Sequence, residues 1–538
     1  MDFDTTKNLF IEGDNLEALK LLQETYLGKV KLIYIDPPYN TGNDFLYKDD
    51  YAVDRQTYLL RSSEEDSLGN RLTTNSSANG RFHSDWLSMM LPRLRLARNL
   101  LTEDGSIFVS IDDHELQNII GLCDEVFGSD NFIGIFVWEK RTTRENRKVF
   151  SVNHDYIVAY AHTKYLFEQC RGLLGRTEES EERFSNPDDD PRGPWQSVSI
   201  NAQAGPGRRR EQFFTITTPS GRKIDPPSGR CWIYTENRFE ELKADGRIWF
   251  GEDGGNVPRL KCFRSESKEG MVPHTLWSAD EVGTTDTAKK AIKDLFNGNE
   301  VFDTPKPVEL LRRIIQIATG SDRCSIVMDF FGGAAPLAEA TMAQNAEDSS
   351  ARQFIIVQLP ELCGSDSEAL KAGYKTIADV AKERMRRAGA AIKTRTTLTA
   401  PNLDAGFRAI KIDTSNMRDV YYAPDAVAQG DLLAQVDNIK PDRTPEDLLF
   451  QVLVDWGIDL ALPIAAEKIE GMQVFFVDTN ALAACFDAGL TDDMVKEIAK
   501  RKPLRAVFRD ASYGTDSVKI NVEQIFKLLS PDTEVRSI

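Results

Sequence analysis

Residues 30–40 read VKLIYIDPPYN, an apolar run broken only by Lys31 and followed by Asp36 and two prolines. A run of this kind is typical of a parallel β-strand that is buried on both faces. Proline cannot continue a central strand, so the strand should end at Ile35. Ligands of open α/β sheets bind outside the carboxyl ends of the strands. The sequence therefore predicts a site at Asp36-Pro37-Pro38-Tyr39.

The segments on either side of this strand alternate between strand-like and helix-like patterns. A short apolar run at 9–11 precedes a helical pattern that Asp14 or Asn15 can cap. Such alternation predicts an α/β fold with a mainly parallel sheet. A Ser/Asn-rich stretch at 62–81 is predicted to be a loop. The other predicted strands are 106–111, 325–330 and 353–359, and the other predicted helices are 86–101, 307–318, 337–344 and 367–393.

The middle of the chain has a different composition: it is rich in Gly, Pro, Arg and aromatic residues and shows little helical periodicity. It predicts a loop-rich domain inserted into the α/β unit. The 538 residues are too many for one ordinary core. We therefore predict a first half of the core at 1–135, an insertion at 136–295, a second half at 296–395 and a C-terminal domain at 396–538.

Composition limits the classes of protein. The chain has no apolar run of membrane-spanning length and no leader-like start, and its seven cysteines are scattered without a CxxC pair. With only five histidines as well, neither a disulfide framework nor a metal site is expected. A soluble protein of the reducing cytoplasm, without a membrane partner, is the expectation.

The formal net charge of −18 opposes binding to nucleic acid on average, but binding is local. Basic runs of this kind are usually solvated surface, and that alternative stays open for the two runs of this chain. Both lie inside the predicted insertion, and they comprise Lys140, Arg141, Arg144, Arg147 and Lys148, and then Arg208, Arg209 and Arg210.

The predicted site has the groups needed to act on an aromatic amino group. The lone pair of such a nitrogen is delocalised into the ring, and two acceptors aimed at its hydrogens would localise it. Asp36 can be one acceptor and the Pro37 carbonyl the other, held by a backbone that two prolines restrict. Tyr39 offers a flat face on which a flipped-out base can stack. The alternative is that Asp-Pro-Pro-Tyr is only a rigid turn.

These motifs resemble those of the β group of amino methyltransferases and, more narrowly, of the Mod subunits of type III restriction–modification systems. The resemblance covers most of the chain and is weakest across the middle. It implies a Rossmann-like, S-adenosylmethionine-dependent core with an inserted target-recognition domain and a C-terminal domain. The segments that carry it are IEGDNLEALKLL, KLIYIDPPYNTGNDFLYKDDY, GSIFVSIDDHE, FDTPKPVELLRRII, VMDFFGGAAPLAEA and NAEDSSARQFIIVQLPE.

The resemblance also implies roles for single residues. Asp36, Pro37, Pro38 and Tyr39 match the catalytic motif. The chain departs from the fuller cofactor motif just after Gly333, where Ala334, Ala335 and Pro336 stand. Asp14 could equally be a helix cap, the Gly332-Gly333 pair an ordinary turn, and the acidic Asp112, Asp113 and Glu361 helix caps. The cofactor-binding residues implied are Asp14, Asp36, Lys306, Pro307, Asp329, Phe330 and Gly333.

For the whole protein, the resemblance implies methylation of adenine N6 in double-stranded DNA. The implied DNA-binding residues are Lys140, Arg141, Arg144, Arg208, Arg209 and Arg210. The resemblance also implies a homodimer that binds an ATP-dependent helicase–nuclease subunit. The chain has no phosphate-binding loop motif, so it is not expected to hydrolyse ATP by itself. Three alternatives remain open: methylation of cytosine N4, methylation of RNA, and a DNA-reading subunit without catalysis.

Overall fold

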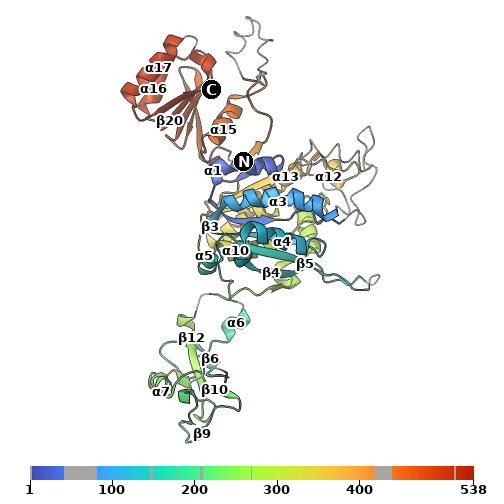
Figure 1. Ribbon diagram of the computed structural model, residues 1–538, viewed down its shortest axis with the longest axis vertical. Helices are drawn as coiled ribbons and strands as arrows, with labels where there is room; N and C mark the ends of the chain where they lie inside the picture. Colours follow the sequence, from blue (N-terminus) through green and yellow to red (C-terminus); the bar gives the residue numbers. More distant parts are fainter. Residues whose placement is uncertain are drawn as a thin grey trace. The chain divides into compact units, whose positions relative to one another are not determined.

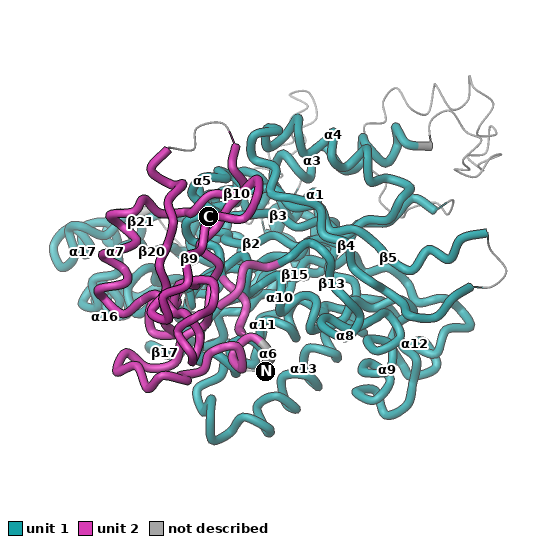
Figure 2. Tube along the Cα trace, turned by 90° about the horizontal axis from the view of Figure 1, so that it is seen from below, with its two compact units in different colours: residues 1–172, 274–538 teal, residues 173–273 magenta. Residues whose placement is uncertain are grey.

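The computed structural model describes residues 3–41, 82–145, 149–176, 178–205, 210–267, 270–418, 439–513 and 516–538. The chain divides into two compact units, residues 1–172 with 274–538 and residues 173–273, which are coloured separately in Figure 2. The loop predicted at 62–81 lies outside the described residues.

A nine-stranded sheet organises the first unit, in the order β13-β4-β5-β3-β2-β14-β15-β1-β16. The strands from β3 to β16 in this order are parallel, whereas β5 runs antiparallel to β3 and to β4. This confirms the predicted α/β fold. The strands are β1 (Leu9–Glu12), β2 (Val30–Ile35), β3 (Leu101–Ile111), β4 (Phe132–Glu139), β5 (His154–Ala161), β13 (Leu276–Trp277), β14 (Ile326–Asp329), β15 (Gln353–Gln358) and β16 (Arg408–Lys411).

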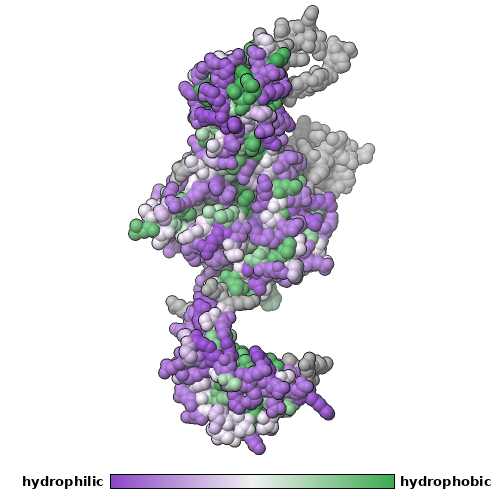
Figure 3. Space-filling view, turned by 90° about the vertical axis from the view of Figure 1, so that its left-hand side faces the viewer, coloured by the Kyte–Doolittle hydropathy of each residue, from purple (hydrophilic) through white to green (hydrophobic). Residues whose placement is uncertain are grey.

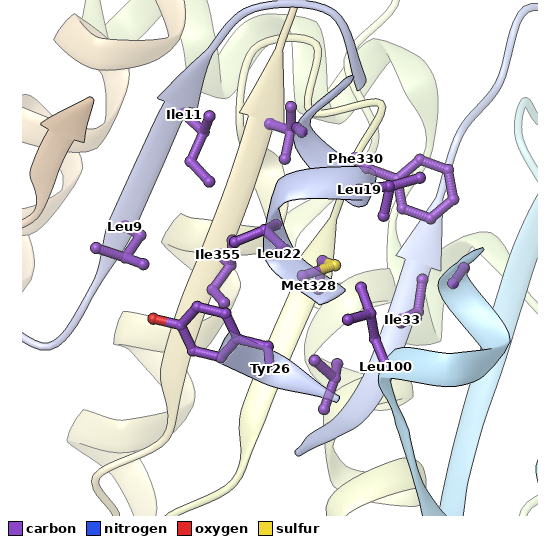
Figure 4. Close-up of a cluster of buried hydrophobic side chains, with 14 of the residues drawn as sticks. Leu9, Ile11, Leu19, Leu22, Tyr26, Ile33, Leu100, Met328, Phe330 and Ile355 are labelled. Carbon is purple, nitrogen blue, oxygen red and sulfur yellow. The ribbon is translucent and has the colours of Figure 1, made fainter. Parts of the chain in front are cut away.

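Helices cover both faces of this sheet (Figure 1). On one face, α1 (Asn15–Tyr26), α3 (Phe82–Leu100) and α4 (Leu116–Phe127) pack side by side, and on the other α10 (Val308–Thr319), α11 (Pro336–Asp348) and α13 (Ile377–Arg395) do so. Figure 4 shows the cluster beneath α1, which includes Leu19, Ile33 and Met328. Burial on both faces explains why β2 is apolar at nearly every position.

The helix predicted at 367–393 is broken into α12 (Glu368–Lys371) and α13. Gly373 has φ +94°, a conformation that ends a right-handed helix, and a capping box of Thr376 and Asp379 starts the next one. In the described part of the first unit before residue 396, the remaining helices are α5 (Lys164–Cys170), α8 (Ala279–Val282) and α9 (Thr285–Leu295), with a 3-10 turn at Ser129–Asn131.

The second unit, residues 173–273, is shorter than the predicted insertion at 136–295. The expected boundary at 136 falls inside β4, because the basic run after it forms the connection between two paired strands and not the start of a domain. The unit has its own core, in which Trp232 and Phe239 are fully buried. Its elements are α6 (Glu178–Glu182), β6 (Trp195–Ser199), β7 (Asn201–Gln203), β8 (Ile216–Thr217), β9 (Lys223–Ile224), β10 (Arg230–Trp232), α7 (Glu236–Ala244), β11 (Ile248–Trp249) and β12 (Arg259–Phe263), with 3-10 turns at Arg210–Gln212 and Arg264–Glu266.

The C-terminal segment forms a separate five-stranded sheet in the order β17-β18-β19-β20-β21. One face packs on its own helices through residues such as Phe476 and Phe508, and the other joins the core beneath α1 through Phe475 and Val507. Its elements are α15 (Pro445–Asp455), β17 (Ile464–Ile469), β18 (Met472–Val477), β19 (Leu482–Cys485), α16 (Asp492–Lys500), β20 (Arg505–Phe508), α17 (Asp516–Leu529) and β21 (Glu534–Ser537), with a 3-10 turn at Asp510–Tyr513.

The surface is largely polar. Hydrophilic side chains cover most of the face in Figure 3, with apolar ones in small groups. Among the described residues, every helix is too short or too polar to cross a membrane.

We expect Tyr26→Phe to weaken the attachment of the C-terminal segment to the core. The Tyr26 hydroxyl donates to Asp459 Oδ1 at 2.7 Å, and both groups lie in the interface between α1 and that segment. Asp459 keeps the Ala461 amide as a donor, so the loss should be about 1 kcal/mol. Urea unfolding measures it, with Tyr165→Phe on the exposed surface as the control. Equal midpoints for both variants would contradict this role.

Candidate active site at the carboxyl ends of the parallel strands

The predicted catalytic turn lies where β2 leaves the sheet. β2 ends at Ile35, and its neighbour β14 ends at Asp329, with Met328 in register with Ile33. Because the two strands are parallel, Asp36 and Asp329 emerge at the same edge of the sheet. Asn40 closes the turn with φ +56°, a left-handed conformation that asparagine tolerates better than most residues.

Asp36 forms an ion pair with Lys306. The lysine ammonium lies 2.6 Å from both carboxylate oxygens, and its side chain is almost buried. The same ammonium is 5.1 Å from the ring centroid of Tyr39 and 5.9 Å from that of Trp138, so it lies within cation–π distance of both rings. The structure thus joins Asp36 and Tyr39 of the predicted catalytic motif to Lys306, which the resemblance assigned to the cofactor.

Asp329 is buried beside this pair. Its carboxylate accepts a hydrogen bond from the Phe331 amide at 2.9 Å. Burial is the main cause that raises the pKa of Asp329 to about 8; the Phe331 amide and Lys306 oppose this shift, and the negative charge of Asp36 adds to it. A pocket between the two carboxylates is lined by Asp36, Lys306 and Asp329 together with Phe302, Phe331 and Gly333.

The loop after β14 forms one wall of this pocket. Gly333 has φ +51° and donates its amide to Gln358 Oε1 at 2.6 Å, whereas Ala335 takes a left-handed conformation without being glycine. A Cβ on Gly332 would lie 2.5 Å from Ile356 Cγ2, so glycine is required there for packing on β15. Acidic side chains and a close backbone suit a ligand with cationic groups, and S-adenosylmethionine carries a sulfonium and an ammonium.

Three further residues that the resemblance assigned to the cofactor have other contacts in the structure, and their cofactor role stays a prediction. Asp14 caps α1, accepting from the Leu16 and Glu17 amides at 2.8 and 3.2 Å, which is the alternative left open by the sequence. The Phe330 side chain is in the core beneath α1, where Figure 4 places it beside Leu19. Pro307 occupies the N-cap position of α10. None of the three lines the pocket between Asp36 and Asp329.

Sequence reasoning missed two buried carboxylates near the catalytic turn. Asp155 on β5 forms an ion pair with Lys140 at 2.5 Å. Burial raises the pKa of Asp155; the positive charges of Lys140 and Lys306 oppose this shift, and the negative charge of Asp36 adds to it. Glu115, at the start of α4, contacts Asn40. A signal for both was available: Glu115 follows β3 close to the acidic pair Asp112-Asp113, and Asp155 lies near the start of β5, which pairs antiparallel with β3. Asp112 itself accepts from the His114 amide, as a cap does.

The predicted DNA-binding residues differ in their surroundings. Lys140 is held by buried Asp155, whereas Arg141 and Arg144 are exposed on the connection between β4 and β5. Arg210 is exposed in the second unit. Arg208 and Arg209, like Arg147 and Lys148, lie outside the described residues.

Comparison with known proteins shows the class to which this fold and site belong. The family model described as DNA methylase matches residues 30–355, so the chain belongs to that family. Within it, the chain is 36% identical over 411 residues to the type III restriction-modification enzyme StyLTI Mod subunit of Salmonella typhimurium, covering 76% of this chain and 60% of that protein. It is 31% identical to the EcoPI Mod subunit of Escherichia phage P1, covering 75% and 65%. The Mod-subunit resemblance is thereby confirmed.

The matches to the Mod subunits are partial, and the chain is also similar to a methyltransferase of another type. The chain spans less than two thirds of the length of these Mod subunits. It is also 27% identical to the type II methyltransferase M.KpnI of Klebsiella pneumoniae, covering 71% of this chain and 88% of that protein.

The buried Asp329 predicts a pH dependence of stability. Between the ordinary carboxyl pKa of 3.8 and about 8, the unfolded chain releases this proton while the folded chain keeps it. Rising pH should therefore favour unfolding through this group. Asp329→Asn mimics the protonated form, so its free energy of unfolding relative to the wild type should increase from pH about 5 to pH about 8. A difference between the two proteins that stays constant with pH, in urea unfolding, would contradict the shift.

Proposed function

We propose that this protein transfers a methyl group from S-adenosylmethionine to the N6 amino group of an adenine in double-stranded DNA. The observation that carries the proposal is Asp36, at the carboxyl end of β2 and followed by two prolines, facing the pocket that Asp329 and Gly333 line. The family match and the Mod-subunit relatives support the same activity.

The proposed role of Asp36 is to accept one hydrogen of the amino group, while the Pro37 carbonyl accepts the other. Both oxygens of Asp36 contact Lys306, but a carboxylate has about four lone-pair positions and can accept further bonds. Lys306 compensates the negative charge of Asp36 beside the buried Asp329 and Asp155. Asp329 and Gly333 would hold S-adenosylmethionine, which would supply the methyl group as a sulfonium donor, and the proton that the amino nitrogen loses would pass to water.

Tyr39 is proposed to stack on the flipped adenine. Burial and the charge of Asp36 raise the pKa of its phenol, so the ring stays neutral. Replacing the ring removes the stacking surface, whereas the hydroxyl contributes little to it.

The proposal extends to partners and location. Double-stranded DNA is the substrate, the second unit carries target recognition, and the protein works in the cytoplasm as a homodimer that an ATP-dependent helicase–nuclease can join. The similarity to M.KpnI supports a second candidate, a methyltransferase that acts without a restriction partner. An incubation of the purified chain with DNA, with and without the helicase–nuclease partner and ATP, separates the two candidate functions. Cleavage that appears only with the partner supports the first candidate.

Asp36→Ala should abolish methyl transfer and leave DNA binding intact. A lost acceptor in the transition state costs about 10²-fold or more in rate. Nucleoside analysis of DNA after incubation with labelled S-adenosylmethionine measures the product, with exposed Asp130→Ala as the matched control. N6-methyladenine from the wild type and none from Asp36→Ala supports the proposal. N4-methylcytosine, product in RNA only, or an Asp36→Ala rate within about tenfold of the wild type would contradict it.

Arg141 and Arg144 should contribute to DNA binding by neutralising phosphates. Replacing both with Ala should reduce the slope of log K against log salt by about 0.9 for each phosphate that the variant no longer neutralises, without changing stability. Lys496→Ala with Lys500→Ala, on α16, is the matched control. Lys140→Ala should instead lower stability, because it leaves Asp155 buried and unpaired. An unchanged salt slope in the arginine variant would mean that this connection does not touch DNA.

A further inference from the structure

Glu115 is a carboxylate with no exposed surface at the start of α4. Glu115 occupies the N-cap position of α4, but its side chain makes no capping hydrogen bond. Its oxygens instead accept from three side chains: Asn40 Nδ2 at 2.6 Å and His83 Nδ1 at 2.7 Å contact Oε1, and Asn118 Nδ2 at 2.6 Å contacts Oε2. A buried carboxylate is costly unless it is fully hydrogen-bonded, so this arrangement fixes its partners.

The first of these partners belongs to the catalytic turn. Asn40 directly follows Tyr39, is buried, and has a left-handed backbone. Such a conformation is less favourable for asparagine than for glycine, and it persists when the surroundings hold it. The hydrogen bond from Asn40 Nδ2 to Glu115 Oε1 stabilises this conformation.

The second partner lies at the start of α3. His83 is in the first turn of this helix, and one turn later the Trp86 indole donates to the Pro38 carbonyl at 2.7 Å. Glu115 is therefore linked to the catalytic turn by two routes. It contacts Asn40 directly, and it contacts His83 on α3, the helix that carries Trp86. The neighbouring strands bring these pieces together, since β3, which leads to Glu115, pairs with β2, which leads to Asp36.

We propose that Glu115 is a positioning residue for methyl transfer: it fixes the Asp36–Tyr39 turn through Asn40 and Trp86, and so aims Asp36 and the Pro37 carbonyl. This inference rests on the proposed function for its catalytic consequence but not for the tether itself. A displacement of about 1 Å at a reacting group can cost about 10²-fold in rate.

Four variants test the tether. Asn40→Gly keeps the left-handed backbone without strain and removes the side chain that donates to Glu115. Glu115→Ala removes the acceptor, and the double variant combines the two changes. Asn118→Ala is the matched control, because it removes the Oε2 partner and leaves the contact with Asn40.

We expect Asn40→Gly and Glu115→Ala each to lower kcat by about tenfold to 10²-fold, with the Kd for S-adenosylmethionine within about twofold of the wild type. The double variant should lose less than the sum of the two single losses, because the single variants share the contact between Asn40 and Glu115. Asn118→Ala should keep kcat, and Glu115→Gln should retain most of it, since Gln can present an oxygen to Asn40 while Asn118 turns its amide. Additive losses, an equal loss in Asn118→Ala, or equal losses in Glu115→Gln and Glu115→Ala would overturn the proposal.

A second readout does not depend on activity. The 15N–1H signal of the Trp86 indole, identified by its absence in Trp86→Phe, reports the bond to the Pro38 carbonyl. It should shift in Asn40→Gly and Glu115→Ala and stay in place in Asn118→Ala. An unmoved signal in the first two would overturn the tether. If the wild type itself transfers no methyl group, the proposed function fails, whereas this signal still decides whether Glu115 holds the turn.

Discussion

The ion pair between Asp36 and Lys306 is the interaction on which the candidate site depends. It joins two residues 270 positions apart, one at the end of β2 and the other just before α10. Asp36 lies near two buried acidic groups, Asp329 and Asp155, whose pKa values its negative charge helps to raise. Lys306 contacts both oxygens of Asp36 and so balances the negative charge of the catalytic turn.

The sheet makes this pairing possible. β2 and β14 lie side by side and parallel, so their carboxyl ends form one edge where the proline-rich turn and the glycine loop face each other. β3 and β5, on the other side of β2, bring Glu115 and Asp155 to the same edge. The second unit leaves this framework after residue 172 and returns at 274, while the C-terminal sheet shares the core beneath α1.

The sequence predicted the parts of this arrangement that local patterns encode. Strand β2, its end at the prolines and the return of α/β alternation after the insertion follow from hydrophobic runs and from residues that break them. The partners of Asp36 and Asn40 were not predictable in this way, because Lys306 and Glu115 meet them only through strand order. The domain boundary at 136 was misplaced for a related reason: a basic run can begin a domain or connect two strands of a hairpin, and only the pairing of β4 with β5 distinguishes the two.

Sequencing of host DNA with detection of modified bases, after expression of the wild-type chain, decides whether the protein methylates adenine. Methylated adenines are expected at one recurring sequence, and they should be absent from the same host without the protein. Modified cytosines in place of adenines, or unmodified DNA in cells that contain the folded protein, would contradict the proposed function.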